Sequence, residues 1–172
     1  MHRGRRASRI GLAVVVTLAC AAVGQELVGP LTPFAPLVGT SWIGHFTSSP
    51  APPFDHLIEW KAILDGQVVR WTKRVEAVGF SMETFFYWDA ELDAVAFIQL
   101  SSNGVHGRGE VEFEDGVIAL VGVAMQTWAP VEFRQTFEVL SDGTLEDRYY
   151  TRVGTKWSPE HVISYSLRPG TD

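Results

Sequence analysis

Apolar and polar residues alternate along most of the chain after Trp42, and a period of two is typical of β-strands with one buried face. Turn dipeptides of the Asp-Gly or Asn-Gly type separate the alternating segments, and they favour tight hairpins because both turn residues need positive φ. Helical periodicity is weak, apart from a single turn near residues 33–37. The pattern predicts ten strands, at residues 42–46, 56–64, 67–75, 81–89, 94–101, 105–113, 117–125, 131–140, 145–153 and 161–168.

Short strands joined in sequence by hairpins predict an antiparallel meander, and closing the meander into a barrel removes its exposed edges. We therefore expect an all-β fold, an antiparallel up-and-down β-barrel of about ten strands over residues 37–169. Residues 25–36 contain Pro30, Pro33 and Pro36 and are expected to form a proline-rich tether in front of it.

The turn at Asp65-Gly66 fixes the register of its two strands, because apolar residues should face apolar ones. A two-residue turn pairs Trp60 with Trp71 and Ala62 with Val69 on a core face. It leaves Lys61 and Arg70 opposite each other on the other face, which we expect to face water.

Two-residue turns at Asn103-Gly104 and Asp115-Gly116 predict an inner face made of small residues. They place Ile98 opposite Gly109 and Leu100 opposite Gly107. The small inner residues are then Ala94, Ala96, Gly107, Gly109, Gly122 and Ala124. Such residues form either a cavity floor for a ligand or a shelf on which tryptophans pack. We favour the shelf, because barrels commonly use small residues and bends to close.

The outer face of residues 117–123 carries an apolar stripe, formed by Val117, Ala119, Val121 and Val123. A stripe of this kind is either a partner surface, such as a homodimer contact through Val117, Val121 and Val123, or is covered by another segment. We favour coverage by the proline-rich tether.

Two registers remain open for the hairpin at Asp142-Gly143. With a two-residue turn, Gln135 shares the inner face with Arg148, Tyr150 and Arg152, a basic lining suited to a carboxylate headgroup. If Ser141 joins the loop, Gln135 shares that face with Asp147, Tyr149 and Thr151, which could carry out acid–base chemistry. A third interpretation is ordinary surface charge on a hairpin.

The first 24 residues have the composition of a secretory signal peptide: four arginines in residues 1–9, then an apolar run from Ile10 to Gly24. Cleavage after Gly24 predicts an exported, periplasmic or secreted, protein. An alternative is a lipid anchor on Cys20, although Thr17 stands where a lipoprotein signal usually has leucine.

The remaining 148 residues suffice for one domain and contain no cysteine, so they form no disulfide. They carry ten basic and twenty acidic residues, a formal charge of −10. Such a chain repels phosphate backbones, which argues against nucleic acid as a partner.

Several segments together resemble the bacterial lipocalin-like proteins of the calycin superfamily. They are "LVG" before a tryptophan, "IEWKAILDGQVV", "FFYWDAELDAVAF" and "SSNGVHGRGEVEFEDGVIAL". The resemblance implies a barrel with an apolar interior that binds a small hydrophobic molecule. It covers about residues 37–168 and rests mostly on turn and aromatic positions.

The glycine and tryptophan of "LVGTSWIGHF" also resemble, more distantly, the opening of the haem-binding nitrobindins. Here Ser41 adds a residue between Gly39 and Trp42, and "GHFTSSPAPP" departs from their pattern. The resemblance implies His161 as the haem ligand. The other histidines of the mature chain lack metal-ligand spacing, and an exposed His161 at a strand start is the plainer interpretation.

We therefore expect an exported barrel that binds a small hydrophobic or amphipathic molecule, without cofactor, metal or catalytic residues, since no catalytic motif is present. The expected ligand-binding residues are Trp42, Trp60, Trp71, Ile98, Gly107, Gly109, Phe133, Gln135 and Phe137. The alternatives are a barrel enzyme acting on a lipid-like substrate, a haem protein using His161, and a non-catalytic envelope interaction protein.

Overall fold

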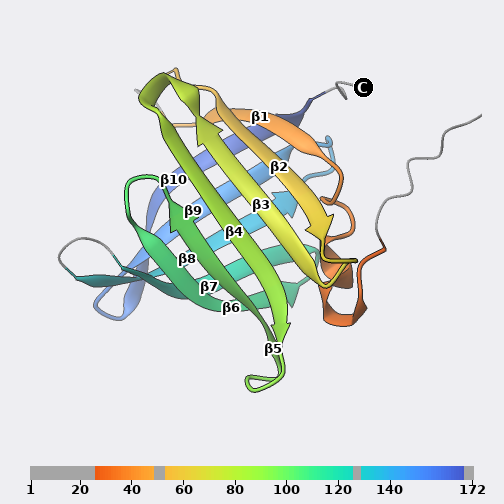
Figure 1. Ribbon diagram of the computed structural model, residues 1–172. Helices are drawn as coiled ribbons and strands as arrows, with labels where there is room; N and C mark the ends of the chain where they lie inside the picture. The colour runs from red at the N-terminus through yellow and green to blue at the C-terminus, as the bar shows by residue number, and fades with distance from the viewer. Residues whose placement is uncertain (1–25, 49–52, 126–128, 169–172) are drawn as a thin grey trace, which may run out of the picture.

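The computed structural model describes residues 26–48, 53–125 and 129–168. Ten antiparallel strands form one closed barrel in which each strand pairs with its sequence neighbours, and β1 closes the circle against β10, with Trp42 opposite Leu167 (Figure 1). The predicted fold class is thus confirmed. The strands are β1 (Ser41–Phe46), β2 (His56–Ile63), β3 (Val68–Val75), β4 (Phe80–Asp89), β5 (Ala94–Ser101), β6 (His106–Glu114), β7 (Val117–Met125), β8 (Pro130–Val139), β9 (Leu145–Val153) and β10 (Lys156–Leu167).

The proline-rich segment closes one end of the barrel. Its 3₁₀ helix η1 (Gly29–Phe34) lies earlier than the turn predicted near residues 33–37 and packs against β3, β4 and β5. Leu31, Phe34 and Leu37 are fully buried in the core. The prediction that this segment covers the outer valine stripe is therefore wrong, because its apolar side chains enter the barrel end instead.

A second 3₁₀ helix, η2 (Glu76–Val78), links β3 to β4. Among the residues that the structure describes, no helix is long and apolar enough to cross a membrane.

Aromatic rings fill the half of the barrel next to η1. Trp60 lies at the centre of this packing, with its ring centroid 5.5 Å from Trp71, 5.8 Å from Phe86 and 5.2 Å from Phe137. Phe34 of η1 joins the cluster, 6.0 Å from Trp60 and 4.7 Å from Phe86. Each such side chain contributes roughly 1.5–3 kcal/mol by burial.

Two of the predicted registers are confirmed. Trp60 pairs with Trp71, and Lys61 pairs with Arg70 on the outer face. Across β6 and β7, Gly109 pairs with Gly122, and Asp115 and Gly116 both have positive φ, as the two-residue turn requires.

The predicted register between β5 and β6 is wrong by one residue. Ser102, Asn103 and Gly104 form a three-residue loop, in which the Ser101 amide donates to the Val105 carbonyl at 3.0 Å. The Asn103 side chain accepts a hydrogen bond from the Val105 amide, and Gly104 has a φ of 84°, a common arrangement for such loops.

Because side chains alternate between faces, that single residue turns all of β5 over. Val95, Phe97 and Gln99 face the interior, whereas Ala96, Ile98 and Leu100 lie on the outer face, with Ile98 40% and Leu100 53% exposed. Ala94 and Ala96 therefore do not belong to the inner patch that the sequence predicted, and Ile98 does not face the interior.

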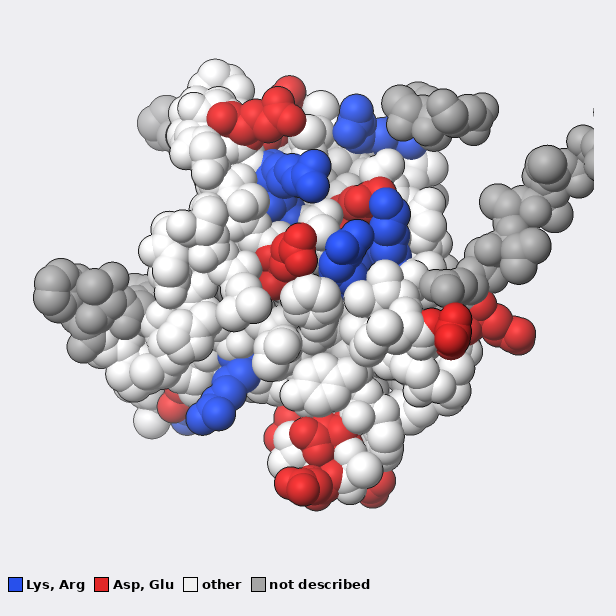
Figure 2. Space-filling model, viewed as in Figure 1, with Lys and Arg blue, Asp and Glu red and all other residues white. Residues whose placement is uncertain are grey.

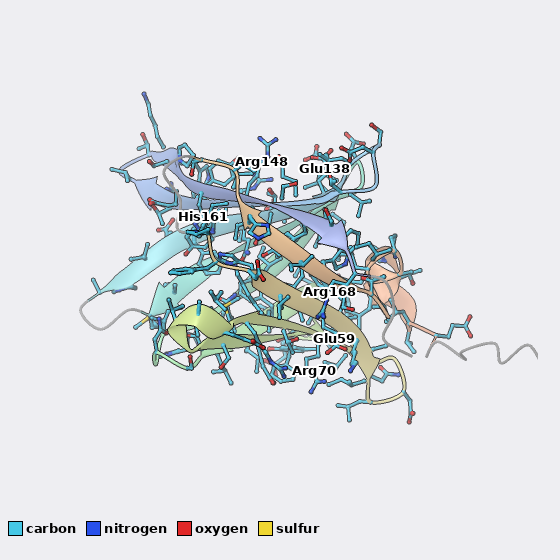
Figure 3. All side chains as sticks on the ribbon, turned by 90° about the horizontal axis from the view of Figure 1, so that it is seen from above. Glu59, Arg70, Glu138, Arg148, His161 and Arg168 are labelled. Carbon is cyan, nitrogen blue, oxygen red and sulfur yellow. The ribbon has the colours of Figure 1, made fainter. Side chains whose placement is uncertain are left out.

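The last hairpin adopts the second of the two registers left open. Ser141 is part of the loop, since the Leu140 amide donates to the Thr144 carbonyl at 2.8 Å, and Gln135 pairs with Tyr149. Figure 3 shows Arg148 pointing away from the barrel, so the basic lining is not formed. The interior receives Asp147 instead.

We expect Phe34→Ala to lower the free energy of unfolding by about 3–5 kcal/mol, because it removes a fully buried ring that closes the barrel end. Urea denaturation measures this loss. Val28→Ala, in the same segment but 45% exposed, is the matched control and should change stability by less than about 0.5 kcal/mol. Equal losses for both variants would contradict the role given to η1.

Candidate functional site

Polar side chains gather inside the half of the barrel opposite η1. Lys73 from β3, Gln135 from β8 and Asp147 from β9 all face the interior and are buried. Lys73 Nζ lies 3.7 Å from Asp147 Oδ2, and Gln135 Nε2 donates to Asp147 Oδ1 at 2.8 Å. A buried ion pair costs several kcal/mol per ion in lost hydration, so stability alone does not explain it.

An aromatic row surrounds this polar group at the same end. The His161 ring stacks on Tyr149 at 5.2 Å and meets Phe46 edge-on at 5.3 Å, and Phe46 meets His56 at 4.6 Å. Figure 3 shows His161 directed toward the space that the strands enclose. Tyr149 in turn stacks on Phe133 at 5.5 Å, which links the row to the aromatic core.

Burial shifts the pKa values of titratable groups in the half of the barrel opposite η1. Burial, with Lys73 and His161 nearby, lowers the pKa of His56 to about 4, and burial also lowers that of His161. Burial, with Glu160 and Asp147 nearby, raises the pKa of Tyr149 to about 12. Both histidines are thus neutral at pH 7, and the phenol of Tyr149 keeps its proton.

Several buried polar atoms have no hydrogen-bond partner among the described residues. They include both ring nitrogens of His56, the hydroxyl of Tyr165 and Asp147 Oδ2. Buried polar groups are nearly always paired in folded proteins, so this group is a candidate for contact with a small polar molecule.

Most of the predicted ligand-binding residues lie in a filled core. Trp42 is 4% exposed and its indole nitrogen donates to Thr40 Oγ1 at 2.7 Å. Trp60, Trp71 and Phe137 are at most 1% exposed and pack against one another. Phe133 is also buried and packs against Phe97 and Tyr149. Gln135 is different, because it belongs to the polar group with Asp147.

The remaining predicted residues, Ile98, Gly107 and Gly109, meet at a groove of about 830 Å³. The groove also involves Tyr87 and Leu92 of the β4–β5 hairpin and Val123 and Met125 of β7. The side chains of Ile98 and Val123 lie on the outer face of the sheet.

Glycines of β6 and β7 account for the shape of this groove. A Cβ at Gly109 would overlap the Val121 carbonyl oxygen, so β6 and β7 approach more closely here than side chains allow. On the interior side, Gly107 and Gly122 lie against Phe133 and Phe97. The glycines therefore serve as a shelf for phenylalanines within the barrel and as the floor of a groove outside it.

Charged side chains also line the groove. Asp89 and Glu110 contribute carboxylates, and Arg108 and His106 contribute basic groups. Figure 2 shows acidic side chains gathered at the protruding tip of the β4–β5 hairpin, at the bottom of the view.

The fold has a counterpart among solved structures. The crystal structure of Rv2717c from M. tuberculosis superimposes with a TM-score of 0.51, covering 84% of this chain and 99% of that chain at 17% sequence identity. No family model matches the chain. No curated protein matches its sequence either. At this identity the likeness concerns the barrel fold alone.

The sequence did not single out Lys73 or His56. Lys73 follows Trp71 by two residues, so the register of the Trp60–Trp71 pair already placed it on the inner face, and this was a usable signal. Iron ligation by His161 stays a prediction. Within the described ranges, no three His, Cys, Asp or Glu side chains lie close enough to hold a metal ion.

The lowered pKa of His56 makes stability depend on pH. Between pH 6.5 and about 4 the unfolded chain binds a proton at His56 that the folded chain does not, so the free energy of unfolding falls as pH falls. Each pKa unit corresponds to about 1.4 kcal/mol, and we expect a loss of about 2 kcal/mol between pH 7 and pH 4.5 relative to His56→Gln.

Urea denaturation of both proteins across this range measures the difference. His106→Gln removes an exposed ring on β6 that is not among the groups shifting the pKa of His56, and it serves as the control. A pH dependence that is the same in wild type and His56→Gln would refute the assignment.

Proposed function

We propose that the protein binds a small hydrophobic or amphipathic molecule in the outer groove between the β4–β5 hairpin and β6–β7. The observation that carries the proposal is the groove itself, about 830 Å³ in volume, which falls within the usual range for small-molecule sites. The barrel fold is compatible with ligand binding. Ile98, Gly107 and Gly109, which the sequence analysis expected to line the barrel interior, line this outer groove.

The packing of the barrel interior favours the groove over the core as the binding place. An apolar ligand among Trp60, Trp71 and Phe137 would have to displace rings that already contact one another at about 5 Å. Displacing packed core groups costs several kcal/mol, whereas Ile98 and Met125 are already 40% and 42% exposed. Covering these exposed side chains with a ligand is favourable.

The charged groups at the groove suit a molecule with a polar end. Arg108 and Glu110 lie two residues apart on the outer face of β6. The cross-strand neighbours of Arg108, which are Ile98 on β5 and Val123 on β7, are apolar. A guanidinium beside apolar side chains can bind a carboxylate through two hydrogen bonds while the apolar body lies along the sheet.

We also propose that the chain is exported and that it resembles the calycins in taking up small apolar molecules. The signal sequence and Cys20 lie outside the described residues. N-terminal sequencing of the protein recovered from its native host should begin at Gln25; an intact N-terminus would contradict cleavage, and a blocked Cys20 would favour the lipid anchor.

A homodimer through Val117, Val121 and Val123 remains a separate proposal. All three valines are half-buried on the outer face, and Val123 also lines the groove.

Ile98→Asp tests ligand binding in the groove, because a carboxylate there removes apolar contact and is costly to cover. We expect the affinity for the neutral fluorescent probe N-phenyl-1-naphthylamine to fall about tenfold or more, the equivalent of losing one buried aliphatic side chain. Fluorescence titration at pH 7 measures the affinity.

Leu100→Asp is the matched control, since Leu100 lies two residues farther along the same face of β5, is 53% exposed and does not line this groove. It should leave probe affinity unchanged. Equal affinities in wild type and Ile98→Asp would refute the groove as the binding place, and native mass spectrometry of the purified protein shows any molecule carried with it.

A further inference from the structure

The outer face of β6 carries a polar row that lies between two apolar ones. His106, Arg108 and Glu110 are exposed along this strand, each two residues from the next. Their cross-strand partners are all apolar: Leu100, Ile98 and Ala96 on β5, and Met125, Val123 and Val121 on β7. The outer groove therefore has charged groups along its middle strand and apolar side chains on both sides of them.

The cation of this row is not neutralised by the protein. Of the described residues that line the groove, only Arg108 is a lysine or an arginine. Arg134 and Arg152, on the outer faces of β8 and β9, pair with glutamates at 3.9 Å and 2.7 Å. Arg108 forms no ion pair within 4.0 Å with any described residue. Its guanidinium is thus available to a ligand.

The two acidic residues of the groove differ in what they do for the fold. Asp89 Oδ1 accepts the backbone N–H groups of Glu91 and Leu92, at 2.9 Å and 3.2 Å, and so holds the β4–β5 turn. Glu110 pairs with no basic group within 4.0 Å in the part of the chain that the structure describes. An exposed carboxylate therefore accompanies the exposed guanidinium on the same strand face.

The spacing of these two groups suits a ligand head that carries both signs of charge. Two residues along a strand span about 7 Å, and both side chains are long enough to turn toward a molecule between them. An anion bound to Arg108 would be repelled by the nearby carboxylate of Glu110, and a cation bound to Glu110 would be repelled by Arg108. A zwitterion presents the opposite sign to each of them.

We propose that the groove selects a zwitterionic amphiphile, a molecule with an apolar chain and a head that contains an anionic group and an ammonium group. The anionic group binds Arg108, the ammonium group binds Glu110, and the chain lies along Ile98 and Val123. This inference rests on the proposed function, because it concerns the same groove. The protruding β4–β5 hairpin borders the groove, so one molecule fits there better than a flat bilayer does (Figure 2).

Three ligands with the same twelve-carbon chain test the choice of head group: N-dodecyl-N,N-dimethylglycine, which is zwitterionic, laurate and dodecyltrimethylammonium. Each is titrated at pH 7, below its critical micelle concentration, against N-phenyl-1-naphthylamine bound to the protein. An exposed ion pair changes affinity by up to a few-fold, so we expect the zwitterion to bind about fivefold more tightly than either ligand of single charge. Equal or tighter binding of laurate or dodecyltrimethylammonium overturns the proposal.

Variants of the two charged residues should exchange this preference. Glu110→Gln removes the repulsion of an anion, so the affinity for laurate should rise at least to that for the zwitterion; Arg108→Gln should do the same for dodecyltrimethylammonium. The double exchange of Arg108→Glu with Glu110→Arg keeps both signs and should keep the preference for the zwitterion. Glu114→Gln is the matched control, because Glu114 is exposed on the same face of β6 but does not line the groove. An unchanged preference in Glu110→Gln would contradict the assignment.

The results separate this inference from the proposed function. If Ile98→Asp weakens binding of the neutral probe but the three head groups bind equally well, the groove is a binding site and only the inference fails. If Ile98→Asp leaves probe binding unchanged, the proposed function itself fails. Binding to phosphatidylcholine vesicles that the monomeric zwitterion does not compete away would assign the two charges to a bilayer surface and overturn the inference.

Discussion

The packing of Trp60 of β2 against rings from four other segments is the interaction on which the rest of the structure depends. It joins η1, β2, β3, β4 and β8 around one indole, and it fills the barrel half that a ligand would occupy in an open barrel. Because that half is closed, chemistry is confined to the polar far half and to the outer surface. A single buried tryptophan thus organises the closed half of the barrel.

The strands and the closed barrel could be predicted because alternation and Asp-Gly turns are local signals. Which face of each strand lies inside the barrel was harder to predict, since it depends on the length of the loops to within one residue. Ser102-Asn103-Gly104 and Ser141-Asp142-Gly143 form the same type of three-residue loop, yet the sequence analysis left the longer loop open only for the second. Because β5 carries apolar residues on both faces, its sequence pattern did not indicate which face lies inside the barrel.

The polar interior illustrates a different limit. The inward position of Asp147 and Tyr149 was one of two alternatives, and only the register of β8 against β9 decided between them. Lys73 shares the face of Trp71, so its inward direction was implied by a pair that the sequence predicted correctly. Its contact with Asp147 could not be derived, because β3 and β9 are not neighbours in the sheet and meet only across the barrel.

Closure of the barrel also limits how this chain can meet another. Each of the ten strands has a partner on both sides, so most of the sheet formed by the described residues offers no edge to which a foreign strand could be added. The first half of β10 is an exception, because residues 156–161 pair with β9 alone while β1 pairs only with residues 163–167. Over the rest of the barrel, recognition of a second protein uses side chains and loops rather than a strand edge. The same closure protects a sheet rich in valine and aromatic residues from edge-to-edge aggregation.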